Sequence, residues 1–137
     1  MYCILDIETT GGQFNEEGIT EIAIYKFDGH EIVDQFISLV NPEIPIQPFV
    51  VKLTGINNAM LRSAPKFYEV AKRIIEITEG CIIVAHNASF DYRILRTEFN
   101  RLGYDFIKPT LCTVELSKKL IPDQLSYSLG KLVRALG

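Results

Sequence analysis

Long apolar runs, clustered cysteines and an excess of basic residues are all missing from this 137-residue chain. No apolar run approaches the roughly 18 residues that a membrane-spanning helix needs, so we expect no membrane contact. No basic leader precedes the first apolar run, and we therefore expect a cytoplasmic location. The three cysteines, Cys3, Cys81 and Cys112, lack metal-ligand spacing, which indicates buried thiols in a reducing compartment.

The shortage of positive charge limits how the chain can meet nucleic acid. With a formal net charge of −3 and a pI near 5.4, it has no broad basic surface for attracting a long duplex. Any contact with nucleic acid must therefore depend on a local site. The hydrophobic fraction of 47% and the charged fraction of 23% are those of an ordinary globular protein, and the length predicts a single domain, residues 1–137.

The apolar patterns predict an α/β fold with a mixed sheet. Strands are expected at residues 1–7, 18–27, 31–40, 81–86 and 109–114, and the first of them is apolar enough to be covered on both faces. Asp28-Gly29 predicts a hairpin between the second and third strands, whereas the prolines of residues 41–48 predict irregular structure. Helices are expected at 66–79 and 89–102, and shorter ones at 113–120 and from 126. This order favours three antiparallel strands joined to parallel ones, with helices on the faces of the sheet.

Two acids interrupt the first strand, within "CILDIETTGG" at residues 3–12. Asp6 and Glu8 are two residues apart, so their side chains should project from the same face near the carboxyl end of the strand. Like charges about 4 Å apart repel by roughly 4 kcal/mol at an effective dielectric near 20. A cation, a basic partner or protonation must offset this repulsion, unless the strand has already ended and both acids are solvated.

A third acid is predicted to approach the same edge of the sheet. Asp91 falls within the apolar arc of the 89–102 helix, in its first turn, and this helix follows the buried strand "CIIVAH". Sites in open α/β sheets assemble at the carboxyl ends of strands. If the two strands are parallel neighbours, three carboxylates converge there, and such an all-oxygen set suits Mg²⁺ or Mn²⁺.

Two other interpretations of "LDIETTG" are disfavoured. It is superficially similar to the phosphate loop of sugar and acetate kinases, but Glu8 would place bulk and negative charge where a glycine lets the phosphate approach. It is also similar to the Asp-x-Asp nucleophile of haloacid-dehalogenase phosphatases, which need a later lysine and a further acid pair. Neither arrangement is found here.

"LDIETTGG" resembles the first motif of the DEDD 3′–5′ exonucleases of the proofreading epsilon-subunit type. "VAHNASFDYRIL", residues 84–95, resembles their second motif, and "LTGI", residues 53–56, is similar to the loop between the two. The order and spacing of these motifs cover essentially the whole chain. The resemblance implies a ribonuclease-H-like fold, and hydrolysis of the 3′-terminal phosphodiester with release of nucleoside 5′-monophosphates.

The resemblance also implies roles for individual residues. Asp6, Glu8 and Asp91 would be catalytic and would hold two divalent cations, Mg²⁺ or Mn²⁺. The implied contacts to the terminal nucleotides come from short segments near these acids, with an apolar wedge against the last bases: Thr9, Thr10, Gly11, Thr54, Ile56, Met60, Asn87 and Phe90.

The third motif of this family, His-x-x-x-x-Asp or Tyr-x-x-x-Asp, is not found after the second motif. His30 is not followed by an aspartate five residues on, and the pair that has this spacing, His86 and Asp91, already belongs to the second motif, so we expect the general base and a fourth carboxylate to be missing. The ending "LSYSLGKLVRALG" resembles the helix that comes before this motif. We therefore expect a truncated exonuclease domain that is weakly active at most, because losing a general base alone costs about 10²–10⁴ in rate.

The sequence thus predicts an exonuclease domain acting on single-stranded or frayed 3′ ends of DNA, with a DNA polymerase as a candidate partner. Two alternatives remain open. One is trimming of RNA 3′ ends, as in oligoribonucleases, since the first two motifs do not choose between sugars. The other is a non-catalytic module that binds a nucleic-acid end or a polymerase.

Overall fold

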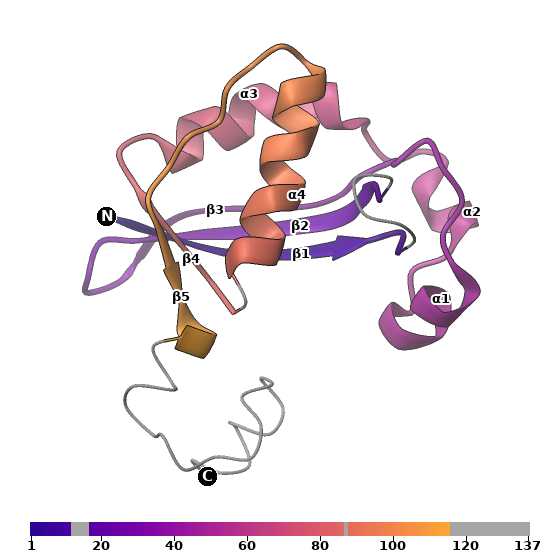
Figure 1. The fold of residues 1–137 in the computed structure, drawn as a ribbon, viewed down its shortest axis with the longest axis horizontal. Coiled ribbons are helices and arrows are strands. Elements are labelled where there is room, and N and C mark those ends of the chain that lie inside the picture. Colours follow the sequence, from indigo (N-terminus) through magenta and orange to yellow (C-terminus); the bar gives the residue numbers. More distant parts are fainter. Residues whose placement is uncertain (12–16, 87, 116–137) are drawn as a thin grey trace, which may run out of the picture.

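The computed structural model describes residues 1–11, 17–86 and 88–115. These residues form one sheet whose strands lie in the order β3-β2-β1-β4-β5, with helices packed against it (Figure 1). In chain order the elements are β1 (Tyr2–Thr9), β2 (Ile19–Phe27), β3 (Ile32–Leu39), α1 (Pro48–Thr54), α2 (Asn58–Leu61), α3 (Phe67–Thr78), β4 (Ile82–Ala85), α4 (Ala88–Arg101) and β5 (Thr110–Cys112).

The sheet is mixed, and the predicted α/β class is confirmed. β1 pairs antiparallel with β2, and β2 with β3, whereas β4 runs parallel to both β1 and β5. The Asp28-Gly29 hairpin is present, and Asp28 Oδ1 accepts hydrogen bonds from the backbone N–H groups of His30 and Glu31. β1 is therefore the central strand, and its carboxyl end lies at the same edge as that of β4.

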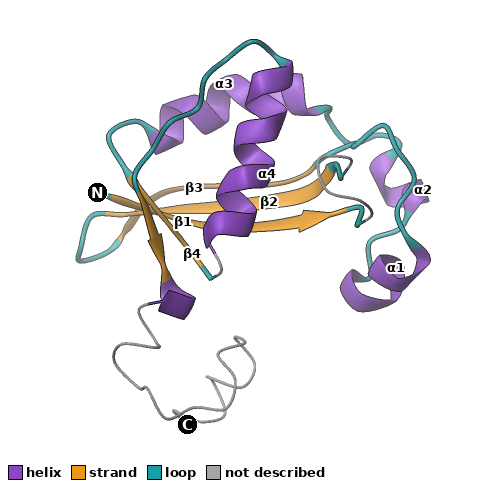
Figure 2. Ribbon diagram, viewed as in Figure 1, coloured by secondary structure: helices purple, strands orange, loops and turns teal. Residues whose placement is uncertain are grey.

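The helices α3 and α4 cover one face of the sheet (Figure 2). In β1, Cys3, Leu5 and Ile7 are buried against these helices, whereas Ile4 and Asp6 on the opposite face are exposed. The prediction that this strand is covered on both faces is therefore wrong for the part of the chain that the structure describes. The apolar run misled because Tyr2 and Ile4 are apolar yet lie on the uncovered face.

Aromatic packing fixes both covering helices over the sheet. Phe99 of α4 lies edge-on to Phe67 of α3, with ring centroids 5.0 Å apart, and stacks on Phe106 at 4.7 Å. α3 buries one side through residues spaced three and four apart, as predicted from its amphipathic pattern. Its first turn is closed by Glu69, whose Oε1 accepts a hydrogen bond from Lys66 N.

The sequence did not predict α1 and α2. The proline-rich stretch ends in a helix because Pro48 occupies its first turn, where a missing N–H costs nothing. Gly55 ends α1 in the left-handed conformation, with φ of 76°. The two helices enclose a second small core made by Ile46, Val50, Ile56 and Leu61.

The predicted helix at 113–120 is described only at its start, where residues 113–115 are helical. Its remainder and the helix predicted from residue 126 lie outside the described residues. None of the helices in the described segments is long and apolar enough to cross a membrane.

Candidate active site

Asp6 and Glu8 project from the uncovered face of β1, as predicted from their spacing. Leu5 and Ile7 alternate with them and point into the core. Asp6 is exposed and Glu8 is half-buried. The pairing with β2 shifts register between Glu8 and Thr9, so the acids stand where the regular ladder ends.

Glu21 of β2 is a further acid near Asp6 and Glu8, and it was not predicted as a site residue from the sequence. It pairs directly with Glu8 across the antiparallel ladder. Burial raises the pKa of Glu8 first, and the negative charges of Asp6 and Glu21 raise it further. The segment "ITEIAIYKF" shows that Glu21 is an acid within a strand, but a long connection separates β1 from β2, so the sequence does not fix their register.

Asp91 lies in the first turn of α4, and only 5% of its surface is exposed. Burial raises the pKa of Asp91 to about 7, and the charges of Asp6 and Glu8 are the next causes. Within residues 1–11, 17–86 and 88–115, its carboxylate has neither an ion pair nor a hydrogen bond. The charges of Asp6 and Glu8 thus act on Asp91, although Glu8 and Asp91 are 83 positions apart along the chain.

The chemistry of this acid cluster, Asp6, Glu8 and Asp91, fits a hard divalent cation, but its spacing is wider than a bound metal would require. The described residues contain no group of three or more His, Cys, Asp or Glu side chains close enough to hold a metal ion. The metal-ligand roles remain a prediction.

The turn after β1 is held by its own side chains. Thr10 is fully buried, and its Oγ1 donates to Gly11 O and accepts from Gly18 N. Thr9 Oγ1 accepts a hydrogen bond from Gly11 N at 3.2 Å. Gly11 has φ of 73°, and a Cβ there would lie 2.8 Å from Val50 Cγ2. The Thr10 side chain thus shapes the turn from inside, and the implied contact of Thr10 with the terminal nucleotide stays a prediction.

The predicted apolar wedge is only partly at the surface. Ile56 is buried between α1 and α2, and its implied contact with a nucleotide stays a prediction. Thr54 Oγ1 donates to Val50 O and accepts from Ile56 N, which occupies it in ending α1. Met60 is exposed, and Asn87 lies outside the described residues.

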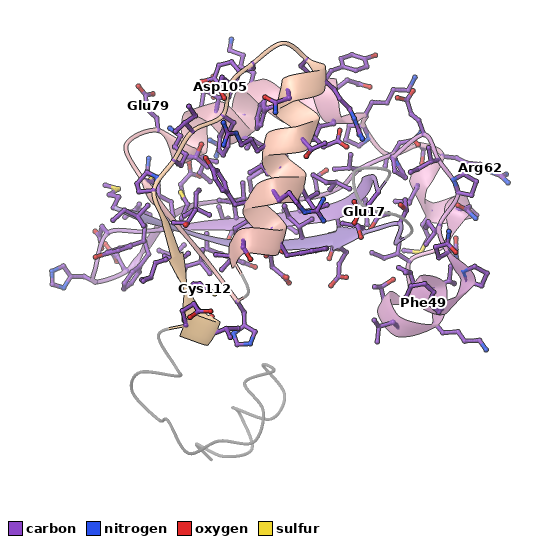
Figure 3. All side chains as sticks on the ribbon, viewed as in Figure 1. Glu17, Phe49, Arg62, Glu79, Asp105 and Cys112 are labelled. Carbon is purple, nitrogen blue, oxygen red and sulfur yellow. The ribbon has the colours of Figure 1, made fainter. Side chains whose placement is uncertain are left out.

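Two exposed side chains on α1 were not predicted. Phe49 and Leu53 are 63% and 81% exposed, and Phe49 extends outward from α1 (Figure 3). The Phe49 ring lies 3.3 Å from the position of a Cβ on Gly11, so it borders the turn that follows Glu8 and Thr9. The spacing of four residues within one helix could have identified the pair, but α1 itself was not predicted.

Phe90 and His86 flank the start of α4. Phe90 is half-buried, packs against the main core and lies under the guanidinium of Arg93, 5.5 Å from the ring centroid. His86 Nδ1 lies 2.8 Å from Thr113 Oγ1, an arrangement typical of a structural histidine.

Comparison with known proteins establishes the family. The exonuclease family RNase_T matches residues 3–137. The chain belongs to this exonuclease family. Because the match includes both acid-bearing segments, the resemblance to 3′–5′ exonucleases is confirmed at the level of the family.

Two curated relatives are themselves long proteins. A PolC-type DNA polymerase III of Caldanaerobacter subterraneus subsp. tengcongensis is 40% identical over 131 residues, which is 96% of this chain and 9% of the polymerase. The 3′-5′ exonuclease DinG of Staphylococcus saprophyticus subsp. saprophyticus is 35% identical over 137 residues, which is 99% of this chain and 15% of DinG. This exonuclease-family chain thus spans a small part of each relative.

Solved exonucleases share its fold. Exonuclease X in complex with 5′ overhanging duplex DNA superimposes with a TM-score of 0.73 and 34% identity, covering 93% of this chain and 68% of Exonuclease X. Exonuclease I in complex with an inhibitor gives a TM-score of 0.85 at 20% identity, covering 98% of this chain and 36% of Exonuclease I. The expected ribonuclease-H-like fold is confirmed.

Proposed function

We propose that this exonuclease-family chain is a metal-dependent 3′–5′ exonuclease domain that hydrolyses the terminal phosphodiester of DNA and releases nucleoside 5′-monophosphates. One observation carries the proposal. Three carboxylates from distant segments, Asp6, Glu8 and Asp91, lie near the end of β1. Burial raises the pKa of Asp91 to about 7, with the charges of Asp6 and Glu8 as further causes, and burial and the charge of Asp6 raise the pKa of Glu8. Perturbed acids at the carboxyl end of a strand are typical of a functional site.

The proposed ligands of two Mg²⁺ or Mn²⁺ ions are these three carboxylates. When bound, such ions lower the pKa of a water and stabilise the leaving 3′-oxygen. The protein would contribute Asp6 and Glu8 from a rigid central strand and Asp91 from the start of a helix, and all three must be deprotonated to bind. Burial of Asp91 makes that ligand the most costly to ionise without a cation.

The proposed substrate surface combines a polar turn with an apolar rim. The turn formed by Thr9 and Gly11 follows the acids of β1 and is bordered by the exposed ring of Phe49. Leu53 on α1 and Met60 on α2 present further exposed apolar surface. Nucleobases stack on such side chains, which supplies about 1–3 kcal/mol per base. A chain with a net charge of −3 can in this way hold one strand end without a basic surface. Exonuclease X, which shares the fold in a complex with DNA, supports DNA as the substrate.

The deciding experiment measures metal binding and strand shortening on purified 1–137. We expect calorimetry to detect Mn²⁺ binding. A 5′-labelled single strand should shorten slowly from its 3′ end, because residues 1–137 carry no His-x-x-x-x-Asp apart from the one within the second motif. Asp6→Asn should abolish both effects, whereas Glu76→Gln, an exposed acid on α3, should change neither. Equal Mn²⁺ binding by wild type and Asp6→Asn would refute the proposed site.

The similarity to a PolC-type DNA polymerase III favours one second candidate, a non-catalytic module that binds a nucleic-acid end or a polymerase. Tight binding of single-stranded DNA with no shortening in Mn²⁺ would select this module. A parallel RNA oligonucleotide tests the trimming alternative, which requires RNA to be degraded faster than DNA of the same sequence. The Glu8→Ala variant is the control in both assays.

A further inference from the structure

An ion pair joins the start of β2 to the second turn of α4. Arg93 Nη2 lies 3.2 Å from Glu17 Oε1, and Glu17 lies on the side of α4 that faces α1 and α2 (Figure 3). The Glu17 side chain is 8% exposed and that of Arg93 is 25% exposed. The two residues are 76 positions apart, so the pair ties together segments that only the fold brings near.

The second oxygen of Glu17 makes the arrangement expensive. Glu17 Oε2 is buried, and it has no hydrogen-bond partner in the part of the chain that the structure describes. Burying a carboxylate with only one of its oxygens paired costs more than an apolar pair of similar size would. Such a pair is weak evidence for a role in stability, so its position between two neighbouring segments is the more informative feature.

Glu17 and Arg93 each lie next to a segment that carries predicted active-site residues. On one side, Gly18 follows Glu17 directly and exchanges two hydrogen bonds with Thr10, through Thr10 N at 2.9 Å and Thr10 Oγ1 at 3.1 Å. On the other side, the Arg93 guanidinium lies 5.5 Å from the centroid of the Phe90 ring. Contacts thus run without a gap from the turn after β1 to the residue that precedes Asp91.

We propose that Glu17 and Arg93 are positioning residues, which fix the first turn of α4 relative to the Thr9–Gly11 turn. They set the distance between Asp91 and the acids of β1, and they hold the Phe90 ring in one orientation through the planar guanidinium above it. This inference rests on the proposed function, because it assigns the pair to that same site. Glu17 lies outside the motifs that indicated the family, and Arg93 lies within the second of them.

The experiment compares two pairs of substitutions in the complete chain. Glu17→Gln keeps the shape but removes the charge, and Arg93→Lys keeps the charge but removes the plane over Phe90. The matched control is the ion pair between Arg73 and Asp34, which joins α3 to β3 at 2.8 Å. Its variants Arg73→Lys and Asp34→Asn remove the same chemistry from another part of the sheet.

We expect the Glu17 and Arg93 variants to raise the Mn²⁺ dissociation constant about tenfold or more, as loss of residues that orient metal ligands commonly does. The double variant should be no worse than the poorer single one, because both remove the same link. The control variants should leave Mn²⁺ binding unchanged. Equal effects in both pairs, or strictly additive effects of Glu17→Gln and Arg93→Lys, would overturn the inference.

Amide hydrogen exchange separates this inference from the proposed function. Loss of the pair should speed exchange in the first turn of α4 and leave the end of the helix near Phe99 protected. Hydrogen exchange tests the positioning role even if the wild-type chain binds no Mn²⁺. Absence of Mn²⁺ binding would refute the proposed function but not the positioning role. If Arg93→Lys does not fold, Glu17→Gln decides the outcome by itself, and unchanged exchange in that variant refutes the positioning role.

Discussion

Glu8 and Glu21 lie directly opposite one another where β1 pairs with β2. Like charges at opposed positions destabilise an antiparallel pair, by roughly 0.2–1 kcal/mol. Glu21→Gln should therefore increase the free energy of unfolding without metal, measured by urea denaturation in EDTA. The same substitution should weaken Mn²⁺ binding, because it removes negative charge next to Glu8.

The opposite signs of these two effects make the prediction specific to the site. Glu76→Gln, which neutralises an exposed acid of α3, should change neither quantity. A Glu21→Gln variant that is both less stable and unchanged in Mn²⁺ affinity would show that Glu21 has no electrostatic role at the acid cluster.

The raised pKa of Asp91 predicts a pH-dependent stability of the metal-free chain. Its folded pKa of about 7 lies above the unfolded value of about 3.9, so the folded state holds the extra proton between these pH values. The free energy of unfolding should fall as pH rises through this range, by about 4 kcal/mol in total. Asp91→Asn cannot ionise, so it should be more stable than wild type at about pH 8 and similar at about pH 4.

Thermal denaturation in EDTA at several pH values measures this difference. At pH 8, excess Mn²⁺ should make wild type more stable than Asp91→Asn. A ligand that binds the folded state raises its stability, and only wild type keeps the Asp91 ligand. Glu79→Gln, at an exposed position, serves as the control. A constant difference between wild type and Asp91→Asn from pH 4 to 8 would contradict a raised Asp91 pKa.

Gly11 and Gly55 share a left-handed backbone but differ in their surroundings. Their φ angles are 73° and 76°, yet a Cβ on Gly11 would lie 2.8 Å from Val50 Cγ2, whereas one on Gly55 meets nothing within 4 Å. Gly55→Ala should cost about 1 kcal/mol, the backbone term alone. Gly11→Ala should cost about 1–3 kcal/mol more, because α1 must move. Chemical denaturation measures both, and equal costs would show that α1 yields freely.

Phe49 and Leu53 should contribute to binding but not to folding. Both are exposed on α1, so Phe49→Ala and Leu53→Ala should leave the melting temperature nearly unchanged. Each should weaken binding of a single-stranded oligonucleotide by about 1–3 kcal/mol if a base stacks there. Fluorescence anisotropy in Ca²⁺ or EDTA measures binding without turnover.

Tyr68→Ala is the matched control for the α1 variants, since Tyr68 is equally exposed but lies on α3. Its affinity for the oligonucleotide should equal that of wild type. If all three alanine variants bind equally well, the nucleic acid does not pass over α1.

The amino-acid sequence was sufficient for the sheet and for three acids of the site. The alternation around Asp6 and Glu8 depends only on local geometry, and the wheel position of Asp91 depends only on the helical repeat. Both predictions depend only on residues that are close in the chain. The side chains of Asp6, Glu8 and Asp91 therefore lie on the predicted faces of β1 and α4. The mixed sheet followed from the order of the elements for the same reason.

The features that were missed depend on contacts between distant segments. The position of Glu21 opposite Glu8 depends on a register that no short turn fixes, and the Glu17–Arg93 pair on how α4 sits over the sheet. α1 was missed because Pro48 was taken as a helix breaker, although the same proline suits a first helical turn. Burial of Thr10 and Ile56 likewise depends on α1 closing over the turn after β1.

The parallel pairing of β1 with β4 places Tyr2 beside Ile82, and this has a consequence during translation. A nascent chain can complete the β1–β2–β3 meander well before the ribosome has made α4. At that stage it carries two of the three acids, but nothing yet brings a third to meet them. Because distant pairings form late in folding, Asp91 joins Asp6 and Glu8 only after β4 has paired with β1 and α4 has packed on the sheet.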